Sequence, residues 1–198
     1  MGFQIQDGTG SSKKVQVTSQ NRIKTDGVTE ERAVLVSLER GKAFNVLTDF
    51  LTITGSTGVE DGILYIKNNS DNNMFLHHLK IWCGTAGQFT KIYLYRNPTT
   101  GTLISSPINA DTVNVNFSSS NTFEGLAYQG DGTNKTITNG DIFGRHYLGV
   151  GMQQIDMQMW MGQVVLGKGG SMAITAEAPN GQQVNITAEI NVYFERQE

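Results

Sequence analysis

The sequence has little charge, few aromatic side chains, and almost no cysteine or proline. Of its 198 residues, 17% are charged and 9% are aromatic, with 15 Lys and Arg against 18 Asp and Glu and a formal net charge of −3. An average domain carries about 25% charged residues. Because affinity for phosphate backbones is mostly electrostatic, this balance excludes a nucleic-acid binder that relies on a basic surface.

Membrane and disulfide features are also missing. Cys83 is the single cysteine, which excludes an intrachain disulfide and a cysteine-based zinc site. No run of about 18 apolar residues predicts a transmembrane helix. The N-terminal residues lack the layout of a signal peptide, and Gln6 stands where a myristoylation motif has Ser or Thr. We therefore expect no membrane partner and no secretion by the usual route.

The chain is rich instead in glycine, with 23 residues, and in neutral polar residues. This composition favours short turns and a weakly charged surface suited to packing against neighbours. Residues 1–30 are the most polar part and hold only scattered apolar residues, which cannot bury a face of their own. They predict an extended N-terminal arm that lies on another chain or on its own domain, residues 31–198. Candidate interface residues in this arm are Phe3, Ile5, Val15 and Val17.

From Arg32 onward, β-branched and aromatic residues alternate with polar ones between clusters of Gly, Asn, Asp and Ser. The clearest case runs from Val184 to Phe194, where every second residue is apolar. Successive side chains of a strand point to opposite faces, so this pattern predicts a strand with one buried face. Met172–Ala176 alternates as well, and Pro179-Asn180-Gly181 between the two is a turn signal. The C-terminus is therefore predicted to be a hairpin.

Alternation predicts about ten strands in all, and it finds no long helix. The segment Asp141–Tyr147 is compatible with a short helix or 3₁₀ turn. Strands separated by turn-rich links at this spacing predict an all-β fold, an antiparallel β-sandwich of the jelly-roll type. The further strands are expected at Ala33–Leu38, Ala43–Thr54, Gly62–Lys67, Phe75–Cys83, Gln88–Arg96, Val113–Phe117 and Phe123–Tyr128.

Residues that could carry out catalysis or bind a metal do not form a known pattern. His77 and His78 are adjacent, so on a strand they are expected to face opposite ways and cannot share a metal. Cys83 falls on an apolar strand face, which predicts an inert thiol. There is no Gly-x-Ser-x-Gly nucleophile motif. The glycine-rich residues 167–171 lack the spacing of a phosphate-binding loop.

The acidic residues also form no pattern that indicates a catalytic or metal-binding site. Glu60 and Asp61 lie in a turn-like segment, where solvated charge is the expected state. The Asn68–Asn73 loop has the composition of a weak calcium binder but lacks EF-hand spacing. We therefore predict no catalytic residue, no metal and no cofactor, and we do not expect an enzyme.

A methionine-rich segment, Met152–Met161, permits two interpretations. Every second residue from Ile155 onward falls on one strand face, and Trp160 lies on the other. The segment is either a core strand filled with Met or a subunit interface, because polarizable Met adapts to partner surfaces and Trp is enriched at interface centres. The candidate interface residues are Met157, Met159, Trp160 and Met161.

Several runs resemble virion structural proteins of tailed bacteriophages. One begins with Asn97-Pro98-Thr99-Thr100-Gly101, and another is Asn109-Ala110-Asp111-Thr112-Val113-Asn114 and the residues that follow it. The opening Asp7-Gly8-Thr9-Gly10-Ser11 is similar to the N-terminal arm of that group. The segment Val165-Leu166-Gly167-Lys168-Gly169 resembles the same proteins near their C-termini.

The resemblance implies a small β-sandwich protein of the particle, of the capsid decoration (cement) type. Such proteins often sit as trimers on the shell, with arms that reach neighbouring subunits. The implied partners are the major capsid protein and other copies of the chain in a homotrimer. The implied location is the capsid surface of a virion assembled in the host cytoplasm.

The alternative is another virion component: a head fibre base, a tail or baseplate protein, or a receptor- or glycan-binding protein. A glycan-binding tip is expected to present clustered exposed aromatic residues on loops. Here Trp82, Tyr93 and Tyr95 fall on predicted strands, and only Tyr128 adjoins a loop. The sequence therefore gives a glycan partner no support.

Overall fold

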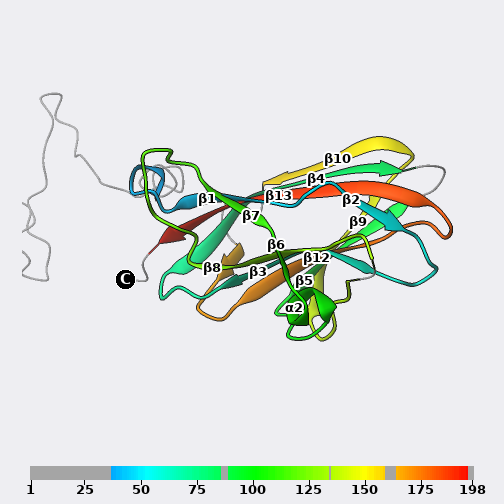
Figure 1. Ribbon diagram of the computed structural model, residues 1–198, viewed down its shortest axis with the longest axis horizontal. Coiled ribbons are helices and arrows are strands. Elements are labelled where there is room, and N and C mark those ends of the chain that lie inside the picture. Colours follow the sequence, from blue (N-terminus) through cyan, green and yellow to red (C-terminus); the bar gives the residue numbers. More distant parts are fainter. Residues whose placement is uncertain (1–36, 86–88, 134, 159–163, 196–198) are drawn as a thin grey trace, which may run out of the picture.

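Strands are the predominant secondary structure of the computed structural model, which describes residues 37–85, 89–133, 135–158 and 164–195. The described strands form two antiparallel sheets packed face to face (Figure 1). The predicted arm and its boundary with residues 31–198 lie outside the described residues. No helix among the described residues is both long and apolar enough to cross a membrane.

Sheet 1 is the seven-stranded layer. Two short strands lie beside its central members: β11 (Val164–Leu166) pairs with β4, and β2 (Leu51–Thr54) pairs with β13. The remaining order across the sheet is β10 (Gly151–Gln158), β4 (Asn73–Thr85), β13 (Gln183–Glu195), β1 (Ala43–Leu47) and β7 (Asp111–Asn114).

Sheet 2 is the six-stranded layer, and one short helix, α2 (Thr102–Ser105), lies near it (Figure 1). Its order is β6 (Ile108–Asn109), β8 (Gly125–Gln129), β3 (Asp61–Asn68), β12 (Ser171–Glu177), β5 (Thr90–Arg96) and β9 (Asp141–Leu148).

The chain alternates between the two sheets as a jelly roll does. From β1 and β2 it passes to β3 in sheet 2, to β4 in sheet 1 and to β5 in sheet 2. It returns from β9 through β10 and β11 in sheet 1 and β12 in sheet 2, and it ends in β13 between β4 and β1. The predicted antiparallel sandwich of the jelly-roll type is thereby confirmed.

The core lies between the sheets and is built from the alternation seen in the sequence. On β13, Val184, Ile186 and Ile190 are fully buried, while Asn185 and Gln183 face solvent. The same alternation on the other strands completes one contiguous cluster, which includes Phe44, Leu64, Ile66, Leu79, Ile81, Ile92, Leu94 and Ile174. This packing fixes which residues of each strand face outward.

An insertion between β5 and β9, residues 97–140, closes one side of the sandwich. It adds β7 to the edge of sheet 1 beside β1, and it adds β8 beside β3 and β6 beyond β8 to the edge of sheet 2. Leu103 of α2 packs with Tyr65 and Ala173 on the outer face of sheet 2. The insertion thus protects two sheet edges and covers part of one face.

Four local expectations are wrong. The turn at Pro179–Gly181 forms, with Gln182 N donating to Pro179 O at 2.9 Å, but it joins β12 of sheet 2 to β13 of sheet 1, so no C-terminal hairpin exists. Asp141–Tyr147 belongs to strand β9 rather than to a helix. The strand expected at Ala33–Leu38 is not formed at its described end, because residues 37–39 are helical. The single strand expected at Ala43–Thr54 is divided into two strands, β1 and β2. In each case tertiary contacts override a pattern that local sequence leaves ambiguous.

Truncating a central core residue should destabilise the fold strongly. Ile190 is fully buried on β13, between β4 and β1. Ile190→Ala should lower the free energy of unfolding by about 2–5 kcal/mol, because it removes buried methyl groups and leaves a cavity. Urea unfolding measures the loss. The exposed Thr54→Ala on β2 is the matched control, and an equal effect of both variants would contradict the assigned core.

Candidate functional site

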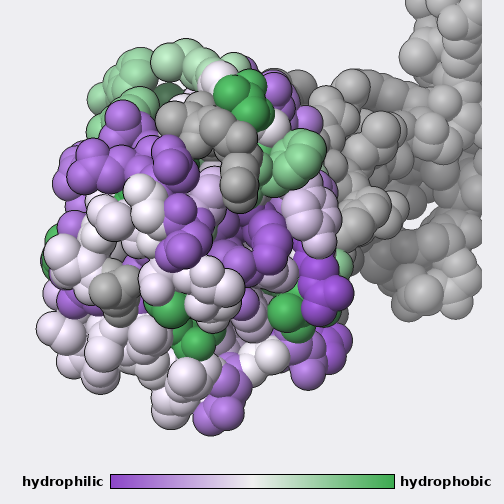
Figure 2. All heavy atoms as spheres, turned by 90° about the vertical axis from the view of Figure 1, so that its right-hand side faces the viewer, coloured by the Kyte–Doolittle hydropathy of each residue, from purple (hydrophilic) through white to green (hydrophobic). Residues whose placement is uncertain are grey.

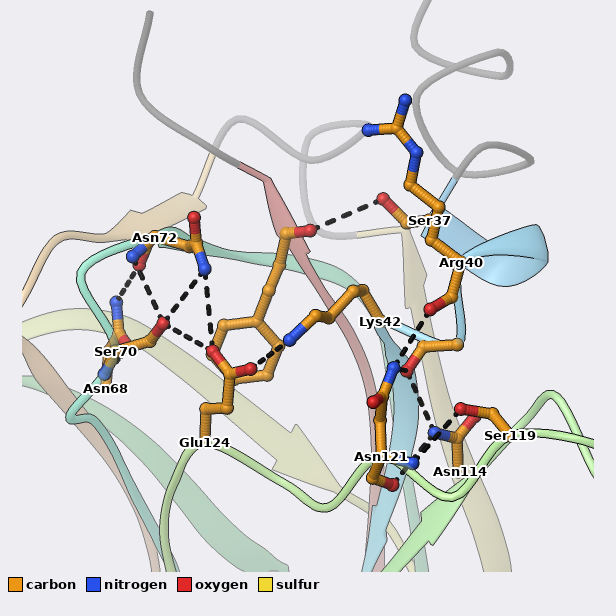
Figure 3. Close-up of polar contacts among 12 residues, drawn as sticks. Ser37, Arg40, Lys42, Asn68, Ser70, Asn72, Asn114, Ser119, Asn121 and Glu124 are labelled. Carbon is orange, nitrogen blue, oxygen red and sulfur yellow. Dashed lines mark hydrogen bonds and ion pairs between the residues drawn. The ribbon is translucent and has the colours of Figure 1, made fainter.

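The first described residues form a turn that side chains of the insertion hold in place. Figure 3 shows Asn114 and Asn121 against the backbone of this turn. Asn114 Nδ2 donates to Gly41 O at 2.9 Å, and Asn121 Nδ2 donates to Arg40 O at 3.0 Å. The contacts join segments about eighty residues apart in the sequence, so the insertion fixes the position of this turn.

A third amide completes the arrangement. Asn116 Nδ2 donates to Leu38 O at 3.0 Å. Residues 37–39 are helical, and the last carbonyl groups of a helix have no partner within it. The side-chain amides supply those partners. We call this set of contacts the arm clamp; it consists of Asn114, Asn116 and Asn121 on the carbonyl groups of Leu38, Arg40 and Gly41.

Gly41 is required in the arm clamp for two reasons. Its φ is +64°, in the left-handed region that favours glycine. A Cβ atom placed there would also lie 2.0 Å from Ser119 Oγ of the insertion. The turn can therefore approach the insertion this closely only with glycine at this position.

A second polar cluster lies beside the arm clamp (Figure 3). Lys42 Nζ forms an ion pair with Glu124, and Ser70 Oγ donates to Glu124 Oε2 at 2.6 Å. Burial alone would raise the pKa of the Glu124 carboxyl, but hydrogen bonds from Lys42 and Ser70 outweigh it and hold the pKa below its ordinary value. The ionised carboxylate thus links the insertion to β1 and to the loop after β3.

That loop is the segment whose composition suggested weak calcium binding. Asn68 is fully buried, and its Nδ2 donates to Leu166 O at 2.7 Å and to Asn72 O at 2.8 Å. Its Oδ1 accepts a hydrogen bond from Ser70 N at 2.9 Å. These polar atoms hold the loop in the fold. Among the residues that the structure describes, no three His, Cys, Asp or Glu side chains are grouped to hold a metal.

A shallow groove of about 310 Å³ lies next to the arm clamp. It follows the outer face of sheet 1, and its lining is mainly apolar. The lining includes Leu38, Ala43, His77, Val115 and Tyr193. Phe117, in the loop just after β7, is 91% exposed.

The opposite end of the molecule presents a second apolar surface. Thr90 pairs with Leu148 and Gly151 pairs with Thr85, so the β4–β5 and β9–β10 connections lie side by side. Figure 2 shows hydrophobic residues gathered at the upper part of this end. The exposed large side chains there are Phe89, Val150 and Met152, at 66%, 60% and 84% exposure.

The predicted interface residues divide into two groups. Phe3, Ile5, Val15, Val17, Met159, Trp160 and Met161 lie outside the described residues. Met157 lies on β10, and it is half-buried and packed against the core beside Ile155. The structure thus places Met157 on the inner face of an edge strand, where it contributes to the core.

The two adjacent histidines share the outer face of sheet 1, contrary to expectation. Asn191 pairs with His78 and Val192 pairs with Leu76, so His77 is an extra residue in the ladder, a β-bulge. His78 Nε2 contacts Asp156 on β10, and His77 lies near the ring of Tyr193. Because of this extra residue, the side chains of His77 and His78 lie on the same face of the sheet and not on opposite faces as alternation predicted.

Glu60 and Asp61 are also placed differently from the expected solvated turn. Asp61 is buried at the start of β3. Glu60 accepts hydrogen bonds from the Tyr95 hydroxyl, at 2.9 Å to Oε2, and from Thr175 Oγ1, at 2.5 Å. Burial and Glu60 raise the pKa of Tyr95 far above its ordinary value. These groups stabilise the outer face of sheet 2. Cys83 is buried as predicted, and burial raises the pKa of its thiol.

Substituting Gly41 tests the arm clamp. Gly41→Ala should lower the free energy of unfolding by more than the ~1–2 kcal/mol that a left-handed backbone costs an alanine, because its Cβ also collides with Ser119. Gly58 is the matched control: its φ is +72°, and a Cβ atom placed there would have no neighbour within 4 Å. Urea unfolding compares Gly41→Ala with Gly58→Ala. Equal losses would contradict the close approach.

Acid should weaken the cluster around Glu124. A carboxyl whose folded pKa lies below its unfolded pKa stabilises the protein above the unfolded value, near 4.3. This stabilisation is lost as the pH falls through the folded pKa. The free energy of unfolding should therefore fall less steeply between about pH 5 and pH 3 in Glu124→Gln than in the wild type. Identical slopes in pH-dependent urea unfolding would contradict the lowered pKa of Glu124.

No protein-family model matches this sequence, and no curated protein does. Among solved structures, a chain from the crystal structure of infectious bursal disease virus VP2 subviral particle is matched with a TM-score of 0.19 and 8% sequence identity. The match covers 78% of this chain and 42% of that chain, so this chain spans less than half of its length. A TM-score this low lies below the level of a shared fold and carries no weight for function.

Proposed function

We propose that this protein is a structural component of a tailed-bacteriophage virion. It decorates and stabilises the capsid by bridging neighbouring capsid subunits, and it assembles as a homotrimer on the capsid surface. The observation that carries the proposal is the arm clamp. Three asparagine side chains of residues 97–140 hold the turn at residues 38–41. This turn follows, in the sequence, an N-terminal segment that is too polar to form a core of its own.

The character of the surface supports the same role. Large apolar side chains are exposed at both ends of the sandwich, with Phe117 at one and Met152 at the other, and further ones, such as Phe50 and Tyr147, are exposed as well. The faces between them carry satisfied polar contacts, such as Asn191 Nδ2 donating to Asn45 Oδ1 at 2.6 Å. A sandwich that exposes apolar side chains at both ends suits a position between larger subunits. The resemblance to phage virion proteins points to the capsid as the partner.

Binding of this kind stabilises a shell by mass action. A protein that binds the assembled shell better than free capsid subunits shifts the equilibrium towards the shell. Three arms and three domains in one trimer multiply modest contacts into high avidity. No bond is made or broken, so the role requires no catalytic group.

Removing the arm is the direct test of its part in attachment. A variant without residues 1–30 should keep the circular dichroism spectrum of the fold but no longer co-sediment with capsids that lack the protein. The full-length chain should co-sediment with them. Normal attachment of the shortened chain would contradict a bridging arm.

The oligomeric state tests the remaining part of the proposal. Sedimentation equilibrium of the full-length chain should give the mass of a trimer. Met159→Asp should yield soluble monomers if the methionine-rich segment forms the subunit interface. Soluble trimers of this variant would exclude that interface, and a monomeric wild type would exclude the trimer.

A further inference from the structure

One edge of sheet 1 lacks the protection that the other edges have. β10 pairs with β4 over eight residues without a register shift, and no described strand pairs with its other side. By contrast, β7 has four residues and β6 has two. The β9 ladder contains a register shift, and β9 carries Asp141 and Arg145. Natural proteins shorten, charge or bulge exposed edges because such edges recruit further strands.

The composition of β10 makes it a good template for another strand. It contains no proline, lysine or arginine. Its one charged residue, Asp156, contacts His78 on the neighbouring strand and accepts a hydrogen bond from Gln154 Nε2 at 3.3 Å. The single charge of this edge is therefore the Asp156 carboxylate, which would not repel a partner strand of net positive charge.

The inner face of β10 is only partly covered. Ile155 and Met157 pack against the core but are half-buried, and no described strand pairs with the far side of β10 to cover them. A strand added here would complete their burial if it carried two apolar residues at a spacing of two. Its alternate residues would lie beside Gln154 and Asp156 on the outer face, and they should be polar.

We propose that residues 13–18 of the chain's own N-terminal segment pair with β10 as an additional strand. In this segment Val15 and Val17 alternate with Gln16 and Thr18, and Lys14 precedes them. The two valines are β-branched and match the spacing of Ile155 and Met157. Backbone hydrogen bonds to the open edge supply the affinity, and the two valines supply the specificity.

Charge and chain length agree with this assignment. Residues 1–25 carry a net positive charge, whereas the whole chain has a net charge of −3, so the remainder is acidic. Eighteen residues separate Thr18 from Ser37, and when extended they span up to ~60 Å. β10 lies three strand spacings from β1, about 14 Å. A tether of this length holds the segment near its own edge at about millimolar effective concentration.

Hydrogen exchange of the full-length chain tests the proposal. Backbone amides of residues 14–18 should exchange about tenfold more slowly than those of an unstructured chain, or slower still. Val15→Asp/Val17→Asp should abolish that protection and speed exchange in β10, with β13 unchanged. The matched control, Phe3→Asp/Ile5→Asp, should leave both protected. Rapid exchange of residues 14–18 in the wild type would overturn the proposal. Loss of protection in Phe3→Asp/Ile5→Asp, with protection kept in Val15→Asp/Val17→Asp, would also overturn it.

Cross-linking identifies which chain supplies the strand. With Cys83 replaced by Ala, Gln16→Cys and Gln154→Cys are treated with a short bismaleimide, whose span tolerates a register difference of two residues. Linked monomers are expected. The control pair, Gln16→Cys with Gln183→Cys, should link much less. Covalent dimers, or equal linking by both pairs, would overturn pairing within one chain. The outcome is independent of whether the protein attaches to capsids.

Discussion

Burial of one face of each central strand between two sheets is the constraint on which the rest of the structure depends. Leu79 and Ile81 on β4 and Ile190 on β13 are completely excluded from solvent. Because side chains alternate, this packing decides which residues face outward on every neighbouring strand. The polar outer faces of the two sheets follow from it.

Alternation made the strands predictable, but it does not encode which strands pair. The turn at Pro179–Gly181 could join a hairpin or cross between sheets, because the flanking strands bury one face in either case. The bulge at His77 leaves no trace in composition, since it is one extra residue in a regular pattern. β9 escaped detection because an edge strand is half exposed and mixes polar and apolar residues.

The arm clamp shows why the candidate site was harder to predict than the fold. Asn114 and Asn121 bind backbone carbonyl groups that are more than seventy residues distant in the sequence. A carbonyl group belongs to every residue, so no pattern of side chains marks it as a partner. Abundant asparagine indicated turns, which is correct for this segment, but not the long-range contact. The sequence did not mark Gly41 either, because glycine is required there by a positive φ and by the close approach of Ser119, and both depend on the folded structure.

The structure presents a jelly roll whose first described turn is held by side chains of residues 97–140, with apolar residues exposed at both ends. These features suit a protein that acts by contact with larger neighbours. Imaging of purified virions, together with mass spectrometry of their proteins, tests this most directly. The account predicts many copies on the outer capsid surface, each between neighbouring capsid subunits. Absence from the particle, or density at the tail alone, would contradict it.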